Sequence, residues 1–261
     1  MVATVKVRRE DDIAVVLLNR PEKLNSFDLD MIGQFANQLI SLAADDEVRG
    51  VVISGEGKGF CAGGDLKWFL DYPQGTPAGF YELTARYHQS ILEIRRMKKP
   101  VIAAINGVAA GGGFSLALAC DFRVMARSAI LRQAYSSSGL SVDGGGTFTL
   151  PRLVGLARAL EIVAFDKPIS SEQALTWGLV TKVVDDGRTL EEATKMAHEL
   201  ANGSINSFGV SKRLLTDSFD TPFEKQLELE REGLSNCAAH PEGKEGIQAF
   251  VEKRKPAFKG E

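Results

Sequence analysis

Short apolar segments alternate with longer amphipathic ones along the first two thirds of the chain. The segments TVKVRRE and DIAVVLLNR flank Asp11 and Asp12, which predicts a β-hairpin. Further short apolar runs predict strands at 50–55, 99–107 and 120–126. Apolar residues at helical spacing predict helices at 28–44, 80–97 and 111–119. Strands that alternate with helices indicate an α/β fold rather than an all-α fold.

The C-terminal part of the chain has a different pattern. From about residue 189 onward the spacing predicts helices and no convincing strand. Ser170 and Gln173, and likewise Thr189 and Glu192, have the spacing of a capping box. Pro222 is expected at the first position of a later helix. A helical region that cannot close its own core is expected to pack on the body or on another subunit.

Composition and charge exclude several classes of protein. The net charge is −3, so no overall basic field favours nucleic acid or an anionic membrane. The three cysteines are odd in number and widely spaced, and the three histidines are not clustered, so we expect neither a disulfide framework nor a metal site. No segment approaches about 18 uninterrupted apolar residues. We therefore expect a cytoplasmic, metal-free protein that binds neither nucleic acid nor membrane.

Three clusters of small residues carry the candidate chemistry: FCAGGDL at 60–66, AAGGGFS at 109–115 and SVDGGG at 141–146. Glycines between a strand and a helix let backbone N–H groups approach a ligand closely. Two such N–H groups, one from each of the first two clusters, can form an oxyanion hole. In the third cluster Asp143 precedes three glycines, and the residues alone leave it as either a helix cap or a reactive group.

The order of these clusters resembles the enoyl-CoA hydratase/isomerase (crotonase) superfamily. The stretches that carry the resemblance are NRPEKLNSFDLDMI, FCAGGDL, KKPVIAAINGVAAGGG, ACDFRV, GLSVDGGGTFTLPRLVG and AFVEKRKPAF. They cover essentially the whole chain in the family's order. The resemblance implies a spiral of ββα units over residues 1–200 and a helical oligomerisation region over 201–261. It also implies a homotrimer or a dimer of trimers.

The resemblance further implies an acyl-CoA substrate, with coenzyme A as part of that substrate and no separate cofactor. By position, the N–H groups of Gly64 and Gly112 hold the thioester oxygen. The residues implied along the CoA side are Lys23, Leu24, Ala62, Asp65 and Leu66. An aromatic matching Phe250 and a lysine matching Lys253 often reach the CoA of a neighbouring subunit in this family.

The positions at which this chain departs from the family pattern reduce the number of reactions that we expect it to catalyse. Family hydratases use two glutamates to activate water, and this chain has Ser115 and Tyr135 at those positions. A hydroxyl and a phenol are poor general bases near neutral pH. Asp143 is the remaining candidate, and its surroundings resemble those of the ring-1,2-epoxyphenylacetyl-CoA isomerases. We therefore expect double-bond or ring isomerisation with Asp143 as acid and base, and with Ser115 and Tyr135 lining the acyl site.

Other activities stay open. The aromatic acyl-CoA dehalogenases also carry this aspartate, so Asp143 is alternatively a nucleophile with His88 as the base that activates water. Those enzymes have a tryptophan where this chain has Tyr135. A hydratase in which Asp143 activates water is a further alternative. A catalytically silent CoA-binding or RNA-binding member belongs to another class, and the acidic balance counts against RNA.

Overall fold

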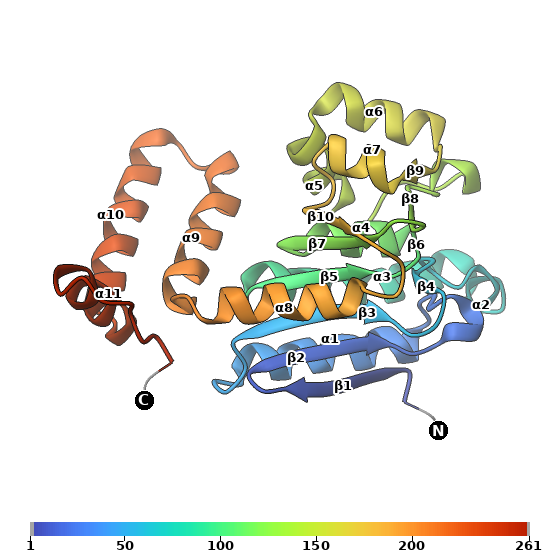
Figure 1. The fold of residues 1–261 in the computed structure, drawn as a ribbon. Coiled ribbons are helices and arrows are strands. Elements are labelled where there is room, and N and C mark those ends of the chain that lie inside the picture. The colour runs from blue at the N-terminus through green and yellow to red at the C-terminus, as the bar shows by residue number, and fades with distance from the viewer. Residues whose placement is uncertain (1–2, 260–261) are drawn as a thin grey trace.

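The computed structural model describes residues 3–259, which form a six-stranded sheet and a four-stranded sheet with helices around them (Figure 1). The strands are β1 (Val5–Glu10), β2 (Ile13–Leu18), β3 (Gly50–Gly55), β4 (Gly59–Cys61), β5 (Val101–Ile105), β6 (Val108–Ala110), β7 (Phe122–Ala126), β8 (Ile130–Arg132), β9 (Ile169–Ser170) and β10 (Lys182–Val184). The helices are α1 (Leu29–Ala44), α2 (Leu66–Leu70), α3 (Thr76–Arg96), α4 (Gly112–Ala119), α5 (Gly146–Val154), α6 (Leu156–Phe165), α7 (Ser171–Thr176), α8 (Thr189–Ala201), α9 (Ile205–Asp217), α10 (Phe223–Ala239) and α11 (Pro241–Val251). Short 3-10 turns lie at Pro21–Lys23, Ser136–Ser138 and Ser218–Asp220.

From β3 to β8, successive strands alternate between the two sheets. The large sheet has the order β1-β2-β3-β5-β7-β10, and the small sheet has the order β4-β6-β8-β9. The hairpin of β1 and β2 is antiparallel, whereas the other pairs of the large sheet are parallel. The chain thus passes through β3 and β4, then β5 and β6, then β7 and β8, and helices follow each pair. This repeat is the predicted spiral of ββα units.

Alternate residues of β2 enter two separate cores. Ala14, Val16 and Leu18 face the core that includes α1, α3 and α4, whereas the intervening residues Ile13 and Val15 face the core beneath α8. All six residues of β2 are buried. A parallel sheet covered on both faces needs such a continuous apolar strand, because each face packs against helices.

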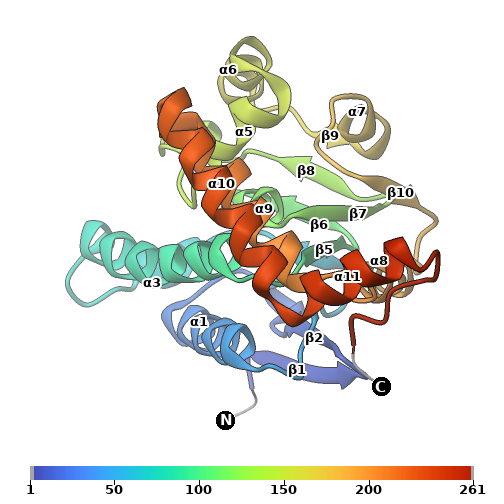
Figure 2. The same ribbon diagram turned by 90° about the vertical axis from the view of Figure 1, so that its left-hand side faces the viewer.

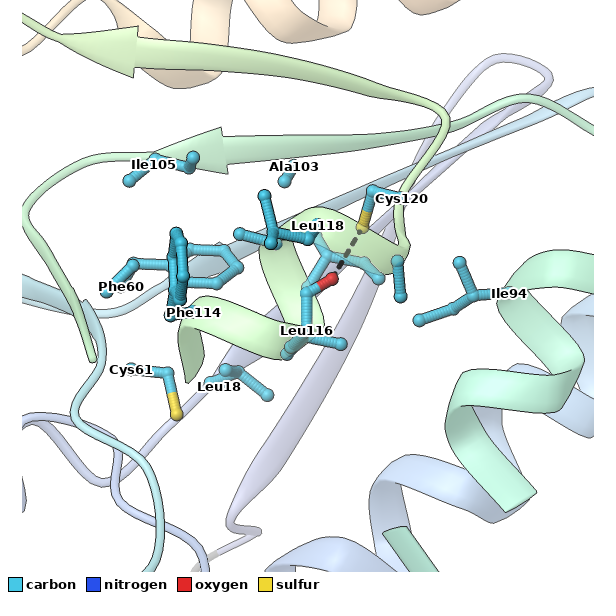
Figure 3. Close-up of a cluster of buried hydrophobic side chains, with 14 of the residues drawn as sticks. Leu18, Phe60, Cys61, Ile94, Ala103, Ile105, Phe114, Leu116, Leu118 and Cys120 are labelled. Carbon is cyan, nitrogen blue, oxygen red and sulfur yellow. Dashed lines mark hydrogen bonds between the residues drawn. The ribbon is translucent and has the colours of Figure 1, made fainter. Parts of the chain in front are cut away.

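Helix α4 lies inside the larger core, where all eight of its residues are buried. Phe60, Ala103 and Ile105 surround its apolar side chains (Figure 3). Near its C-terminus the Cys120 thiol contacts the Leu116 carbonyl oxygen at 3.4 Å. A helix that is apolar all round is stable only when it is enclosed. Close packing therefore fixes the position of its N-terminus, where the glycine cluster lies.

The helices after α8 project beyond the end of the large sheet in Figure 1, and in Figure 2 they lie in front of it. Helix α10 packs on α9 and α11, and α9 contacts α3. Lys212 attaches α9 to the body, because its buried Nζ lies 2.7 Å from both Asp121 Oδ2 and the Ile94 carbonyl oxygen. Large apolar side chains on α9–α11 and the adjoining 3-10 turn are exposed: Leu215, Phe219, Phe223, Leu234, Ile247, Phe250 and Val251. The expected division into 1–200 and 201–261 stays a prediction, and residues 1–2 and 260–261 lie outside the described part.

None of the helices in residues 3–259 is long and apolar enough to cross a membrane. Within those helices, one predicted N-terminus is confirmed and two are wrong. Ser170 and Gln173 form the predicted capping box of α7. Pro222, however, is the N-cap of α10, which begins one residue later at Phe223.

Thr189 does not cap α8. The helix already includes Thr189, the N-cap is Arg188, and no side chain caps this end. Thr189 is buried, and in residues 3–259 its hydroxyl has no hydrogen-bond partner. Glu192 does not reach back to the backbone, because its carboxylate lies 2.6 Å from the Lys182 ammonium group. This ion pair replaces the second half of the predicted capping box.

Candidate active site

The two glycine turns of the first two clusters lie against each other. Gly63 has a φ of +89°, and a Cβ at this position would lie 3.0 Å from the Gly112 nitrogen and 2.9 Å from the Ala110 carbonyl oxygen. Only glycine fits both the conformation and the approach. Gly64 follows in this turn, and Gly112 is the first residue of α4. In the described part of the chain, neither the Gly64 N–H nor the Gly112 N–H has an acceptor.

Phe27 holds the first turn in place. Its N–H donates to the Gly63 carbonyl oxygen at 2.7 Å, and its carbonyl oxygen accepts from the Asp65 N–H at 2.8 Å. Phe69 packs on the other side, since a Cβ at Gly64 would lie 2.6 Å from its ring. Because Phe27 and Phe69 pack on both sides of this turn, the surrounding structure fixes the direction of the Gly64 N–H.

The residues expected along the CoA side come together around this turn. The Ala62 N–H donates to the Leu24 carbonyl oxygen at 3.0 Å, so Lys23 and Leu24 lie beside the segment from Ala62 to Leu66. Lys23, Leu24 and Leu66 are exposed. Asp65 is buried, and its carboxylate accepts from the Trp68 N–H at the start of α2 and pairs with Arg20 at 3.1 Å. Its side chain thus has a structural role that the sequence did not predict.

Phe250 and Lys253 do not join this site within one chain. Phe250 lies on α11 and is 85% exposed, and Lys253 follows the end of that helix. Helix α11 and the glycine turns near β4 lie at opposite ends of the molecule (Figure 1). The two residues are therefore available only to a ligand held outside their own chain's glycine turns.

Asp143 does not cap a helix. Helix α5 begins at Gly146, its N-cap is Gly145 with a φ of +74°, and no side chain caps it. The Asp143 carbonyl oxygen accepts from the Gly146 N–H at 3.0 Å, so its backbone closes the turn. Its carboxylate instead accepts a hydrogen bond from the Tyr135 hydroxyl. The structure thus removes one of the two roles that the sequence left open.

The environment of this pair raises both pKa values. Burial raises the pKa of the Asp143 carboxyl, although the Tyr135 hydrogen bond and the nearby His88 oppose the rise. Burial also raises the pKa of Tyr135, and the charge of Asp143 and their hydrogen bond raise it further. Tyr135 therefore keeps its proton and acts as the donor. Among residues 3–259, Tyr135 is the only residue whose side chain donates a hydrogen bond to the Asp143 carboxylate.

Tyr87 connects the two halves of the site, and no motif in the sequence pointed to it. Its ring is 1% exposed, and its hydroxyl donates to the Gly112 carbonyl oxygen at 2.5 Å. A Cβ at Gly144 would lie 2.5 Å from the same ring. Tyr87 therefore contacts both the turn at Gly112 and the turn that holds Asp143. The available signal was a tyrosine on the same helical face as Leu83, Ile91 and Ile94, where a buried hydroxyl needs a partner.

His88 reaches the Asp143 turn from α3. Its Nε2 accepts from the Gly144 N–H at 3.4 Å, and its side chain is otherwise exposed. Ser115 is fully buried and its hydroxyl has no partner among the described residues. A Cβ at Gly146 would lie 2.7 Å from the Ser115 Oγ, so the small serine lets α5 approach α4 closely. In residues 3–259 no group of three or more His, Cys, Asp or Glu side chains could hold a metal ion.

Comparisons with known proteins find relatives along almost the whole chain. Residues 8–261 match the family described as Enoyl-CoA hydratase/isomerase. The chain is 37% identical over 252 residues to a 1,2-epoxyphenylacetyl-CoA isomerase of Escherichia coli, covering 96% of both chains. It is 30% identical to 4-chlorobenzoyl coenzyme A dehalogenase-2 of an Arthrobacter species, over 95% of this chain and 91% of that protein. A crystal structure of an enoyl-CoA hydratase from a Polaromonas species superposes with a TM-score of 0.92 at 37% identity, covering 97% of this chain and 98% of the other.

Proposed function

The chain belongs to the enoyl-CoA hydratase/isomerase family, and from this membership we propose that it isomerises an acyl-CoA thioester, moving a double bond or rearranging a ring. The names of the three relatives described above support a CoA thioester as substrate, although they differ in reaction. In our proposal, the residues around Asp143 favour isomerisation over hydration and displacement.

The Gly64 and Gly112 N–H groups bind the thioester oxygen. Both are free of other acceptors in the described residues, and the Gly112 N–H lies at the N-terminus of a buried helix. A helix N-terminus favours negative charge, and donors fixed in advance need no reorganisation as the charge develops. They stabilise the enolate that forms when a C–H next to the thioester carbonyl loses its proton.

Asp143 moves that proton. The observation that carries the proposal is its carboxylate, which is freed from helix capping and held by the Tyr135 hydroxyl through one oxygen. The second oxygen removes a proton from one carbon, and the resulting carboxylic acid returns the proton to another carbon. The raised pKa makes the carboxylate a stronger base for the removal step and keeps the resulting acid from losing its proton to water before the proton is returned. The reaction consumes no water and needs no oxidant.

The site gives less support to water addition or displacement. The two glutamate positions of the family hydratases hold Ser115 and Tyr135, and Tyr135 already donates to Asp143. For displacement, His88 would have to activate water through a nitrogen lone pair. The Nε2 lone pair instead accepts the Gly144 N–H.

NMR of the acyl chain tests the proposed reaction. We would follow 2-enoyl, 3-enoyl and phenylacetyl-derived CoA thioesters by NMR in D2O, with the unmodified protein, Asp143→Asn and the control Asp185→Asn. Asp185 is an exposed carboxylate that pairs with Arg127. We expect a shifted double bond or a rearranged ring, lost only in Asp143→Asn, and deuterium in the product to the extent that the Asp143 proton exchanges with solvent before it is returned. Absence of an isomerised product with every thioester would contradict the proposal, and release of a substituent without isomerisation would favour displacement.

We also propose that the C-terminal helices assemble the chain into a homotrimer or a dimer of trimers. The exposed apolar side chains of α9–α11 support this, as does the distance of Phe250 and Lys253 from their own glycine turns. In such an assembly these two residues reach the CoA of a neighbouring subunit. The molar mass in solution by light scattering tests the assembly, and a monomer would contradict it.

A further inference from the structure

An isolated parallel β-bridge between Phe27 and Gly64 sets the direction of the Gly64 N–H. The Phe27 N–H donates to the Gly63 carbonyl oxygen at 2.7 Å, and the Phe27 carbonyl oxygen accepts from the Asp65 N–H at 2.8 Å. The peptide between Gly63 and Gly64 is trans, so its carbonyl and N–H groups point in opposite directions. Because the carbonyl group points to Phe27, the Gly64 N–H points away from Phe27.

Asp28 and Asp65 follow the two partners of this bridge, and each of them begins a helix. The Asp28 carboxylate accepts from the Met31 N–H at 2.9 Å as the N-cap of α1. The Asp65 carboxylate accepts from the Trp68 N–H at 3.3 Å as the N-cap of α2. The two caps therefore join the bridge to a helix on each side.

Arg20 contacts both capping carboxylates with one guanidinium group. Its Nη1 lies 3.0 Å from Asp28 Oδ2, and its Nη2 lies 3.1 Å from Asp65 Oδ2. Nη1 also donates to the Ser26 carbonyl oxygen at 2.6 Å. The side chains of Arg20, Asp28 and Asp65 are 13%, 18% and 8% exposed. Solvent therefore screens these ion pairs less than it screens pairs at the surface.

Lys23 is a second cation near Asp65, and it is more exposed than Arg20. Its Nζ lies 3.6 Å from Asp65 Oδ2, and its side chain is 42% exposed. Burial raises the pKa of the Asp65 carboxyl, but the Trp68 N–H and the two cations lower it by more, so this group is ionised at neutral pH. Lys23 can turn toward a ligand without leaving Asp65 unpaired, because Arg20 remains beside it.

We propose that Arg20 is a positioning residue for the oxyanion donor at Gly64. Its guanidinium group fixes the residues that follow both partners of the bridge, so the Gly64 N–H keeps one direction. A donor fixed in advance stabilises the enolate without reorganisation as the charge develops. This inference rests on the proposed function, because it assumes that the Gly64 and Gly112 N–H groups bind the thioester oxygen. Arg20 acts on the reaction only through Asp28 and Asp65.

The carbonyl stretch of a bound thioester reports the alignment of the donors without any reaction. The probe is butanoyl-CoA, with and without an isotopic label at the carbonyl carbon, so that the infrared difference spectrum isolates this bond. Hydrogen bonds to the oxygen lower its stretching frequency. We expect a frequency below that in water, and loss of roughly half of this shift in Arg20→Lys, since one of two donors loses its alignment. Lysine keeps the charge, but its ammonium group lacks the planar fork that contacts both carboxylates.

Three further variants separate positioning from stability and from affinity. Asp65→Asn keeps a side-chain oxygen to cap α2 but weakens the ion pair, so it should lose the shift as Arg20→Lys does. Arg49→Lys is the matched control and should keep the full shift. Arg49 is 18% exposed and pairs with Glu242 at 3.1 Å, but it precedes β3, whereas the glycine turn follows β4. Lys23→Met should also keep the shift, and should weaken binding about 3-fold.

Steady-state kinetics give a second readout, with the thioester that the NMR experiment identifies as a substrate. Arg20→Lys should lower kcat about 10-fold and leave KM within about 2-fold, because the donor is misdirected while the ligand contacts remain. Lys23→Met should show the opposite split.

The infrared outcomes distinguish the two proposals. In the unmodified protein, no binding of butanoyl-CoA, or a bound carbonyl at its frequency in water, would overturn the proposed function and the role of Arg20 with it. A lowered frequency that both Arg20→Lys and Asp65→Asn retain would overturn the role of Arg20 alone. An equal loss in Arg49→Lys would also overturn it, because a general loosening of the fold would then explain the effect.

Discussion

The Tyr135 hydroxyl donates a hydrogen bond to the Asp143 carboxylate. Tyr135 precedes the 3-10 turn of Ser136–Ser138, and Asp143 lies in the turn before α5, so the intervening loop folds back on itself. The residue at one glutamate position of the family hydratases thus supports another acid. This contact gives each of the two residues a testable role.

Tyr135→Phe should raise the pKa of Asp143 further, because the lost hydrogen bond favoured the carboxylate. As a base Asp143 must be ionised, so activity should increase with pH through its pKa. The acidic limb of the pH–rate profile should therefore move to higher pH in Tyr135→Phe. The control is Tyr81→Phe, since Tyr81 is 82% exposed. An unchanged acidic limb would show that Asp143 is not the group that titrates.

Tyr87→Phe should lower kcat about 10-fold with little change in KM. The variant keeps the ring that supports Gly144 but loses the donor to the Gly112 carbonyl oxygen. A positioning role predicts this split between kcat and KM, together with an unfolding free energy lower by about 1 kcal/mol. If kcat falls only in proportion to the folded fraction measured by circular dichroism, the residue is merely structural.

Gly63→Ala should reduce kcat about 10²–10³-fold, the usual effect of losing one oxyanion donor. The added Cβ would lie 3.0 Å from the Gly112 nitrogen and would separate the two turns. Gly139→Ala is the matched control, because Gly139 also has a positive φ of +67° but a Cβ there meets nothing within 4 Å. Steady-state kinetics of the two variants should differ accordingly, and equal losses would point to backbone strain alone.

Lys212→Met should destabilise the protein by about 3 kcal/mol, because it leaves Asp121 buried without its cation. The double variant Lys212→Met, Asp121→Asn should recover most of this loss, since the amide carries no charge. Urea unfolding measures both free energies. A double variant as unstable as the single one would show that Lys212 acts through its bonds to backbone carbonyls.

Much of the fold followed from the sequence alone. The apolar runs at 50–55, 99–107 and 120–126 contain β3, β5 and β7 as predicted, because a strand that is buried on both faces is a continuous apolar stretch. The glycine turns were also predictable, because strand–glycine–helix junctions occur in the sequence at 60–66 and 109–115. The motifs also indicated the family correctly. Each of them is a short continuous stretch that can be recognised without knowledge of the fold, and together they follow the family's order along the chain.

Only the tertiary structure showed that Asp143 is not a helix cap and that Tyr87 contacts the site. Asp143 has the sequence context of a cap, but α5 begins three residues later, and Tyr135 supplies the hydrogen bond instead. Tyr87 acts on Gly112, which is 25 residues away, and on Gly144. Local periodicity determines which face of a helix or strand is buried. It does not determine which distant backbone that face meets, because that depends on how the turns of the spiral pack together.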